Sequence, residues 1–194
     1  SGSNLIVLLS SIINGLVLPY ILSLDNFANL KTYTLYAGFI GFLHFGFVDG
    51  LNIKYGGHTR EGIDKIEFNG FHKFFISFQI LIVILIISLG FLLNNNIILF
   101  VGMAILPINL QKFFLYFYQA IGEFKDYAIA TIIVPIFNIC VTLMLVFFGI
   151  VDYKFYILST IFSYLISIIF LEKKYKRVTG FCFDISFNTR FIFE

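Results

Sequence analysis

Residues 97–121 read IILFVGMAILPINLQKFFLYFYQAI, an apolar run interrupted by one proline, an Asn and a Gln-Lys pair. A helix that crosses the hydrocarbon core of a bilayer needs about 20 mostly apolar residues, and this run is long enough. A lysine at the centre of such a helix costs about 2.5–3.5 kcal/mol on insertion scales. Lysines in this position usually face a cavity and have a task there. The run therefore predicts a membrane-spanning helix with a functional cation, Lys112.

The rest of the chain has the same character. Of its 194 residues, 59% are hydrophobic and only 12% are charged, against about 25% charged residues in soluble domains. The apolar runs are longer than barrel strands and lack their alternation, so we predict an all-α membrane protein. Its six expected transmembrane helices form one lobe, residues 1–171, and a basic tail or connector, 172–194, follows. The expected spans cover residues 4–23, 32–52, 74–93, 97–121, 127–150 and 155–171.

The basic residues predict how these spans are oriented. Nearly all of the 13 Lys and Arg residues fall on one side of the membrane in this arrangement, the exceptions being Lys31, Lys154 and Lys112. Cytoplasmic loops carry the excess of Lys and Arg, so we expect both ends of the chain in the cytoplasm. The net charge of +2 gives no reason to expect nucleic-acid binding. The two cysteines predict neither a disulfide framework nor a zinc site.

Polar residues in the fourth expected span recur at spacings of three or four, which places them on one stripe of a helix. Lys112 lies about 13 Å from the cytoplasmic end of that span at 1.5 Å per residue, too far for its side chain to reach the interface. We therefore interpret it as a cavity-lining cation suited to an anionic substrate, with His44 and Asn138 as further polar groups of the cavity wall. The stripe consists of Asn109, Lys112, Tyr116, Gln119 and Glu123.

Other polar groups allow simpler interpretations. Ser and Thr stripes in the remaining spans are also typical of helix–helix packing, where each contact contributes about 1 kcal/mol. His44 and Asp49 have the H-x4-D spacing of glycerolipid acyltransferases. In a continuous helix these two residues would point about 140° apart, so we favour a packing or cavity role for His44. The predicted helix exit at Asp49-Gly50 is followed by a tight turn at Gly56-Gly57.

The stretch LHFGFVDGLNIKYGG (43–57) carries a resemblance to a known family. It resembles the end of the second helix in bacterial oligosaccharide flippases of the MATE-like superfamily, which run from Gly-x-x-Asp-Gly into Arg/Lys-Tyr-Gly-Gly. The segments LPYILSLDNFANLKTYTLY (18–36) and QAIGEFKDYAIATII (119–133) are similar to two further connections of that family, although the first lacks the usual glycine. The matching residues, with Glu123, are the expected cytoplasmic motif: Gly46, Asp49, Gly50, Lys54, Tyr55, Gly56 and Gly57.

The resemblance implies both a fold and a function. Such proteins have two six-helix lobes around a cationic cavity, so this chain would be the amino-terminal lobe of a longer protein in the bacterial cytoplasmic membrane. The implied substrate is an undecaprenyl-pyrophosphate-linked oligosaccharide, flipped across the membrane for synthesis of a surface polysaccharide such as O-antigen lipopolysaccharide. The implied partners are membrane lipid, the carboxy-terminal lobe, and the polymerase and chain-length proteins of the same pathway. We expect no catalytic residue, metal ion or cofactor.

Three alternatives remain open. An ion-coupled multidrug exporter of the same superfamily would show an acidic residue deep in a span, and none lies there. A membrane-embedded transferase would use His44, Asp49 and the charged segment 60–67. A non-catalytic membrane scaffold would have no use for the stripe around Lys112.

Overall fold

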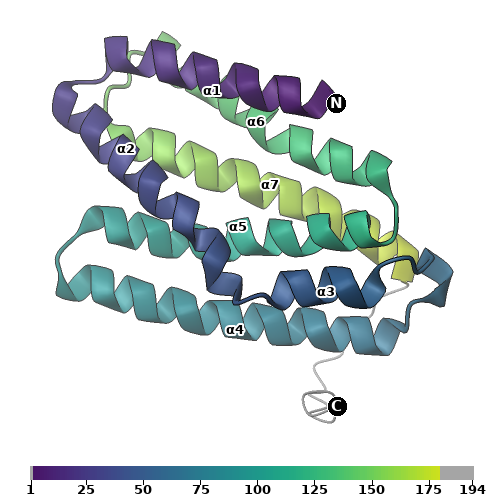
Figure 1. Ribbon diagram of the computed structural model, residues 1–194. Coiled ribbons are helices and arrows are strands. Elements are labelled where there is room, and N and C mark those ends of the chain that lie inside the picture. The colour runs from purple at the N-terminus through teal and green to yellow at the C-terminus, as the bar shows by residue number, and fades with distance from the viewer. Residues whose placement is uncertain (1, 180–194) are drawn as a thin grey trace.

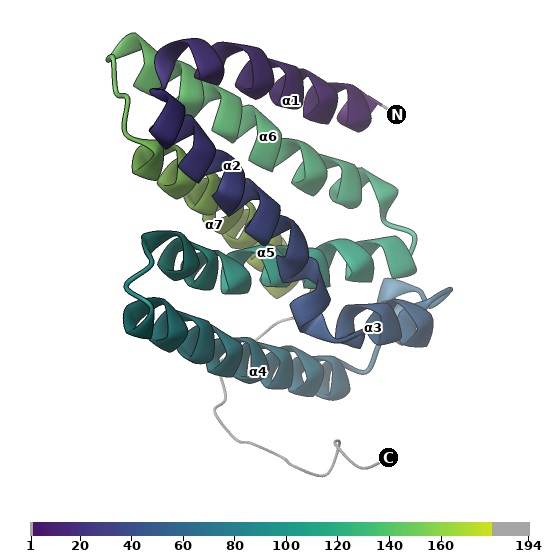
Figure 2. The ribbon, with the colours of Figure 1, turned by 60° about the vertical axis from the view of Figure 1, so that its left-hand side comes forward.

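The computed structural model describes residues 2–179, and every regular element within them is a helix. Long helices lie side by side in Figure 1, with α1 along α6 at the top, α7 and α5 in the middle and α4 at the bottom. The second helix crosses this stack obliquely, as Figures 1 and 2 both show. The elements are α1 (Gly2–Ile21), α2 (Leu24–Phe39), the 3-10 helix η1 (Ile40–His44), α3 (Phe47–Tyr55), the 3-10 turn η2 (Arg60–Gly62), α4 (Lys65–Leu92), α5 (Asn96–Ala120), α6 (Phe124–Phe147) and α7 (Tyr153–Thr179).

Side-chain caps fix where several helices begin. The Asn95 side chain accepts hydrogen bonds from the amides of Ile97 and Ile98 at the start of α5, at 2.9 and 3.3 Å. Asp64 caps α4 in the same way. The first amides of a helix have no partner within the helix, so such caps typically contribute about 1 kcal/mol each. Two polar residues that interrupt the apolar pattern therefore set the boundaries of the long helices.

Helix α5 is the centre of the fold, since it packs against α2, α3, α4, α6 and α7. One end of it belongs to an aromatic core in which the Phe68 ring lies 4.2 Å from the ring of Phe117 and 5.6 Å from that of Phe113. Tilted and edge-to-face ring pairs at such distances contribute about 0.5–1.5 kcal/mol beyond the area they bury. The other end packs in a mainly aliphatic cluster around Ile105 and Ile157.

Length and composition allow four of the described helices to cross a membrane, namely α4, α5, α6 and the first part of α7. The pair α2–α3 is a fifth span if its two bent parts are taken together. The apolar part of α1, from Leu8 to Ile21, is shorter. The described part is thus helical, with four or five segments that are long and apolar enough to cross a membrane. The expected sixth span, at residues 4–23, stays a prediction.

The second expected span, residues 32–52, is not the continuous helix that its apolar sequence predicts. It bends by 53° between η1 and α3. The bend lies at Phe45 and Gly46, both in the left-handed region with φ of 49° and 75°. Beyond the bend the helix continues through Gly50, whose amide bonds the carbonyl of Gly46, and it ends only at Tyr55. The expected exit at Asp49-Gly50 is therefore wrong, whereas the turn at Gly56-Gly57 is present, with Gly57 at φ of 80°.

The connections between helices separate into two ends of the molecule. The α3–α4 and α5–α6 connections lie at one end, on the right of Figure 1, and the α1–α2, α4–α5 and α6–α7 connections lie at the other. Lys65 and Lys125 belong to the first end, and Lys31 and Lys154 to the second. The assignment of the first end to the cytoplasm stays a prediction, and residues 180–194 of the expected tail lie outside the described part.

Candidate functional site

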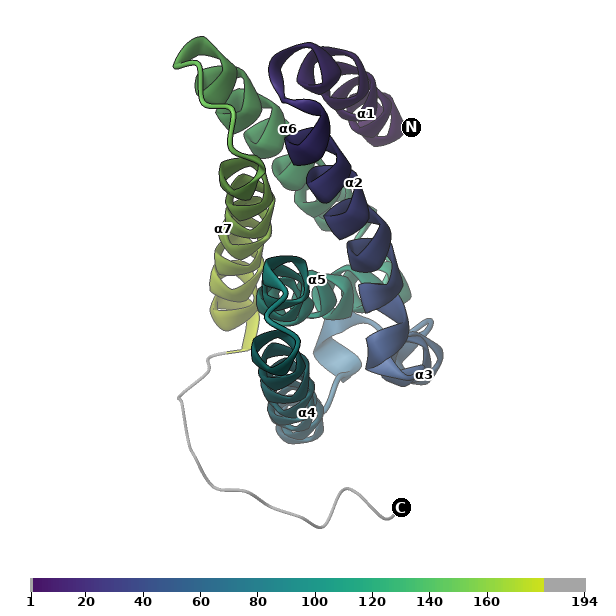
Figure 3. The same ribbon diagram turned by 90° about the vertical axis from the view of Figure 1, so that its left-hand side faces the viewer.

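A cavity of about 530 Å³ lies among α1, α2, α5, α6 and α7. Figure 3 looks along the stack and shows α2 and α7 on opposite sides above α5. The lining residues of α5 are Ile108 and Lys112, and those of α6 are Asn138 and Thr142. The cavity is therefore bordered by parts of the chain that are far apart in sequence. Its volume is within the range of about 300–1,000 Å³ that small-molecule pockets occupy.

Lys112 extends from the middle of α5 into this cavity and is only partly buried. Its ammonium group lies against Gly41 of η1, so closely that a Cβ atom on Gly41 would overlap Nζ. No hydrogen bond or ion pair to Lys112 occurs within residues 2–179, although Asp49 acts on it electrostatically. A cation that faces a cavity without a protein partner is available to an anionic ligand.

The charged side chains that line the cavity are all positive. Among the described residues that line the cavity, Lys31 and Lys112 are the charged ones, and no carboxylate accompanies them. The Lys31 ammonium lies 5.1 Å from the centre of the Phe27 ring, a distance at which a cation interacts favourably with an aromatic face. A pocket with cations and no carboxylates concentrates anions.

A row of amide and hydroxyl groups forms the side of the cavity that faces α1. Asn138 accepts a hydrogen bond from Asn14 Nδ2 at 3.1 Å and donates one to Thr160 Oγ1 at 2.9 Å. All three residues line the cavity. Asn138, predicted as a cavity residue, thus connects α1, α6 and α7. The Asn14 Oδ1 atom is buried and accepts no hydrogen bond within the described part.

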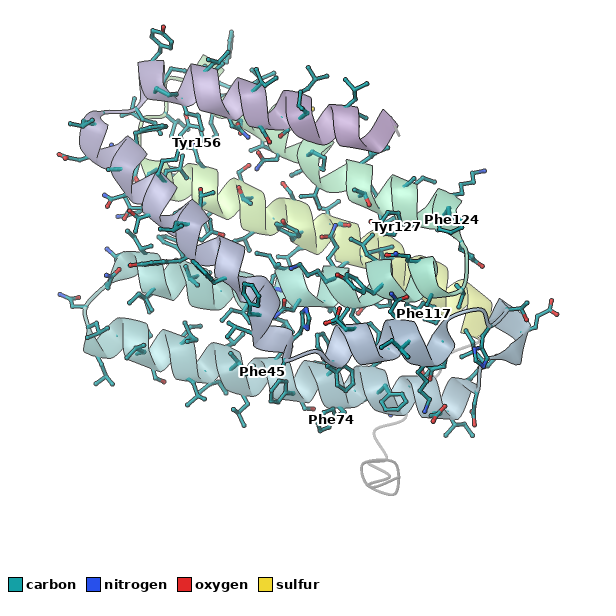
Figure 4. All side chains as sticks on the ribbon, in the orientation of Figure 1. Phe45, Phe74, Phe117, Phe124, Tyr127 and Tyr156 are labelled. Atoms are coloured by element: carbon teal, nitrogen blue, oxygen red, sulfur yellow. The ribbon has the colours of Figure 1, made fainter. Side chains whose placement is uncertain are left out.

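Tyrosines form much of the remaining wall. Tyr33, Tyr156 and Tyr164 all line the cavity, and Figure 4 shows Tyr156 between α7 and α2. The Tyr156 hydroxyl donates to the carbonyl of Ile150 at 2.7 Å. Tyr33 is only 3% exposed, and its hydroxyl has no hydrogen-bond partner among the described residues. Tyrosine offers an apolar ring and a polar tip, which suits a ligand with both kinds of surface.

The other members of the predicted stripe on α5 lie outside the cavity lining. Asn109 is fully buried on the side of α4, where its Nδ2 donates to Gln79 Oε1 at 2.8 Å. Tyr116 packs on the aromatic core, Gln119 is exposed, and Glu123 precedes the first turn of α6. Because α5 has neighbours on several sides, one helical stripe passes through several environments, and the cavity receives only Lys112.

Gln79 explains what Asn109 does. Its Nε2 donates to the carbonyl of Leu43 at 3.2 Å, just before the bend between η1 and α3. A bend in a spanning helix leaves backbone groups without their helical partners, and in a membrane other groups of the protein must satisfy them. Asn109 therefore positions the amide that completes the bent span. Little in the sequence indicates this role, because Gln79 is an isolated amide in an otherwise mainly apolar run.

The predicted cytoplasmic motif joins the ends of three helices. Lys54 forms an ion pair with Glu67 in the first turn of α4 and lies 4.7 Å from the centre of the Phe71 ring. Tyr55 is buried, and its hydroxyl lies 3.5 Å from Glu67 Oε2. The Gly57 amide donates to the carbonyl of Ala120 at the end of α5, at 3.2 Å. These contacts hold α3 against α4 and α5.

His44 and Asp49 are neighbours, contrary to the expectation that they point 140° apart. Their Nδ1 and Oδ2 atoms are 4.0 Å apart, because the chain bends by 53° between them and Phe45 and Gly46 leave helical geometry. The His44 side chain is only 11% exposed, against 57% for Asp49. The imidazole thus has little room for the hydroxyl substrate of an acyltransferase, even though the two side chains are close.

Three further residues of the site were not predicted from the sequence. Lys31 falls in the connection between the first two expected spans, and Tyr33 and Gly41 fall within the second expected span. The only sequence signal for Gly41 is a cluster of four glycines between residues 38 and 50, at positions 38, 41, 46 and 50. Within residues 2–179 no group of three or more His, Cys, Asp or Glu side chains could hold a metal ion.

Comparison with known proteins adds no relative. No family model, no curated protein and no solved structure matches the chain. The fold defines the class, a helical protein with four or five described segments apolar enough to cross a membrane and a cationic cavity between its helices. The particular activity is inferred from the cavity and from the sequence motif.

Proposed function

We propose that the chain is the amino-terminal lobe of a flippase that moves an undecaprenyl-pyrophosphate-linked oligosaccharide across the bacterial cytoplasmic membrane. The observation that carries the proposal is the unpaired Lys112 ammonium in a cavity whose lining has lysines and no carboxylates. The Asp-Gly…Lys-Tyr-Gly-Gly motif gives it the family context. The carboxy-terminal lobe and the proteins that polymerise the sugar repeat are part of the same proposal.

The chemistry of the wall suits such a substrate. Lys112 would attract the pyrophosphate, because a charge-assisted hydrogen bond contributes about 1.5–3 kcal/mol. Asn14, Asn138 and Thr160 offer amide and hydroxyl groups to sugar hydroxyls, and the tyrosines offer rings to the apolar faces of sugars. The isoprenoid chain would remain in the lipid beside the cavity. Two lobes that rock around the bound headgroup would open the cavity first to one side of the membrane and then to the other.

The multidrug exporter is less well supported by this cavity. A transporter of cationic drugs would need a carboxylate near its ligand, and none of the lining residues supplies one. The transferase alternative gains the short distance between His44 and Asp49 but lacks access to the imidazole. The flippase therefore accounts for more of the described residues than either alternative.

Export of the surface polymer tests the proposal. A strain that lacks the native gene receives the full-length protein with Lys112→Gln, Lys112→Arg or Lys125→Gln. Lys125 is an exposed lysine at the start of α6, outside the cavity lining, and is the matched control. We expect Lys112→Gln to lower the export rate about tenfold or more, from the loss of about 1.5–3 kcal/mol, and Lys112→Arg to retain most of it. Unchanged export in Lys112→Gln, or an equal loss in Lys125→Gln, would contradict the proposal.

A further inference from the structure

The bend in the second span brings three ionisable groups together. His44 ends η1, Asp49 lies in the first turn of α3, and Lys112 reaches this place from α5. The His44 Nδ1 and Asp49 Oδ2 atoms lie 4.0 Å apart, and Lys112 acts electrostatically on both groups. Figure 4 shows Phe45 at the bend, on the side of α4. A continuous helix would separate His44 from Asp49, so the bend itself creates the group.

The imidazole of His44 has an unused nitrogen in this environment. Its Nδ1 atom is buried and makes no hydrogen bond within the described residues. The charged groups that act on the imidazole are Asp49 from α3 and Lys112 from α5. From α4, the neutral Gln79 approaches the bend, and its amide donates to the Leu43 carbonyl instead. From α2 no charged group of the described chain acts on the imidazole.

The arrangement gives one carboxylate two cationic neighbours. A proton on His44 would place a positive charge 4.0 Å from Asp49, at the limit of an ion pair, but also near the Lys112 ammonium. Opposite charges within about 4–6 Å favour the charged form of a group, and like charges disfavour it. The affinity of His44 for a proton therefore depends on whether an anion neutralises the Lys112 ammonium. Without such an anion, the lysine charge disfavours a second positive charge on His44.

We propose that His44 and Asp49 form a proton-binding site whose occupancy is coupled to the charge at Lys112, so that anion binding in the cavity and proton binding at the bend favour each other. The proton adds to the free lone pair of His44 Nδ1, and no bond is broken. An anion on Lys112 compensates the ammonium and leaves the Asp49 carboxylate to the protonated His44. The same coupling must act in both directions, because the two binding equilibria share one free energy. The link to the cavity rests on the proposed function, whereas the proton site does not.

Nuclear magnetic resonance of histidine in the full chain, reconstituted in lipid nanodiscs, tests the proton site directly. The chain has three histidines, so selective ¹⁵N-histidine labelling gives few signals, and His58→Gln and His72→Gln assign them by loss of a signal. We expect Asp49→Asn to lower the pH at which His44 takes up its proton, and Lys112→Met to raise it, each by about half a pH unit or more. His58 lies in the exposed α3–α4 connection and is the internal reference.

The outcomes separate the two proposals. A His44 titration that both variants leave unchanged, or that moves together with that of His58, overturns the proton site. If Asp49→Asn fails to fold, Asp49→Ser replaces it with the same expected downward shift, because the carboxylate is again removed. Lys112→Gln replaces Lys112→Met in the same way. Sulfate, whose charge is constant over the range in which histidine titrates, then probes the cavity. We expect sulfate to raise the pH of His44 protonation in the unmodified chain and not in Lys112→Met. Shifts in both variants without any effect of sulfate would keep the proton site and refute its coupling to an anion in the cavity.

Discussion

Gly41→Ala gives the sharpest test of how Lys112 is held. A Cβ atom on Gly41 would overlap the Lys112 ammonium, and the next nearest atom, Lys112 Cε, is 3.6 Å away. The new methyl group therefore meets only the flexible end of one side chain. The Lys112 side chain must move away from η1, whereas the backbone of η1 meets no new contact and should keep its conformation. We expect anion binding to weaken and the fold to remain intact.

The size of the effect follows from the displacement. A bound anion about 4 Å from the ammonium is attracted by about 4 kcal/mol at the effective dielectric constant of 20 that suits partly exposed sites. Moving the ammonium about 2 Å further away would remove about one third of this, or about 1.4 kcal/mol. Gly41→Ala should therefore weaken anion binding about tenfold. Its melting temperature should change little, because alanine is also the better helix former.

Gly38→Ala is the matched control for this experiment. Gly38 lines the same cavity from α2, but a Cβ atom there would meet nothing within 4 Å. Calorimetric binding of inorganic pyrophosphate to the chain in nanodiscs, together with thermal unfolding, compares Gly41→Ala, Gly38→Ala and Lys112→Met. If Gly41→Ala binds as the unmodified chain does while Lys112→Met has lost binding, the contact does not position the lysine. The double variant Gly41→Ala/Lys112→Met should bind no more weakly than Lys112→Met alone, because both changes act through one group.

Three other predictions concern the bent span and its supports. Gln79→Leu should lower the free energy of unfolding by about 1–3 kcal/mol, because Asn109 and the Leu43 carbonyl lose a buried partner. The double variant Gln79→Leu/Asn109→Leu should recover part of this loss in the same denaturation assay. Gly46→Ala should cost about 1–2 kcal/mol, since a side chain at φ of 75° is strained; no measurable cost would show that the bend is elsewhere. Lys54→Gln should cost less than about 1 kcal/mol in thermal unfolding, because the ion pair with Glu67 is partly exposed and such pairs are weak.

The long helices could be predicted from sequence because their cause is local. Apolar runs of sufficient length appear as α4, α5 and α6, and Asn95, between the expected third and fourth spans, caps the start of α5. The predicted turn at Gly56-Gly57 is also present, although the helix before it ends later than expected. The bend at Phe45 and Gly46 has a different origin. Membrane helices tolerate glycine, so nothing in the residues alone says which of several glycines interrupts the second span. The partners that stabilise the bend, such as Gln79, come from other helices.

The bend also accounts for two members of the polar stripe that periodicity predicts on α5, Asn109 and Lys112. Asn109 and Lys112 lie about one turn apart, and both serve the bent span. Asn109 holds Gln79, which bonds the Leu43 carbonyl, and Lys112 lies against Gly41 two residues earlier. In a continuous second span, the backbone carbonyls would accept hydrogen bonds within the helix. The buried side-chain amides of Gln79 and Asn109 would then have no backbone acceptor there. These two members of the stripe thus support a bent helix, and Lys112 faces both the bend and the cavity. This double position is the physical reason to expect that a change at the bend, such as protonation of His44, alters the affinity of the cavity for an anion.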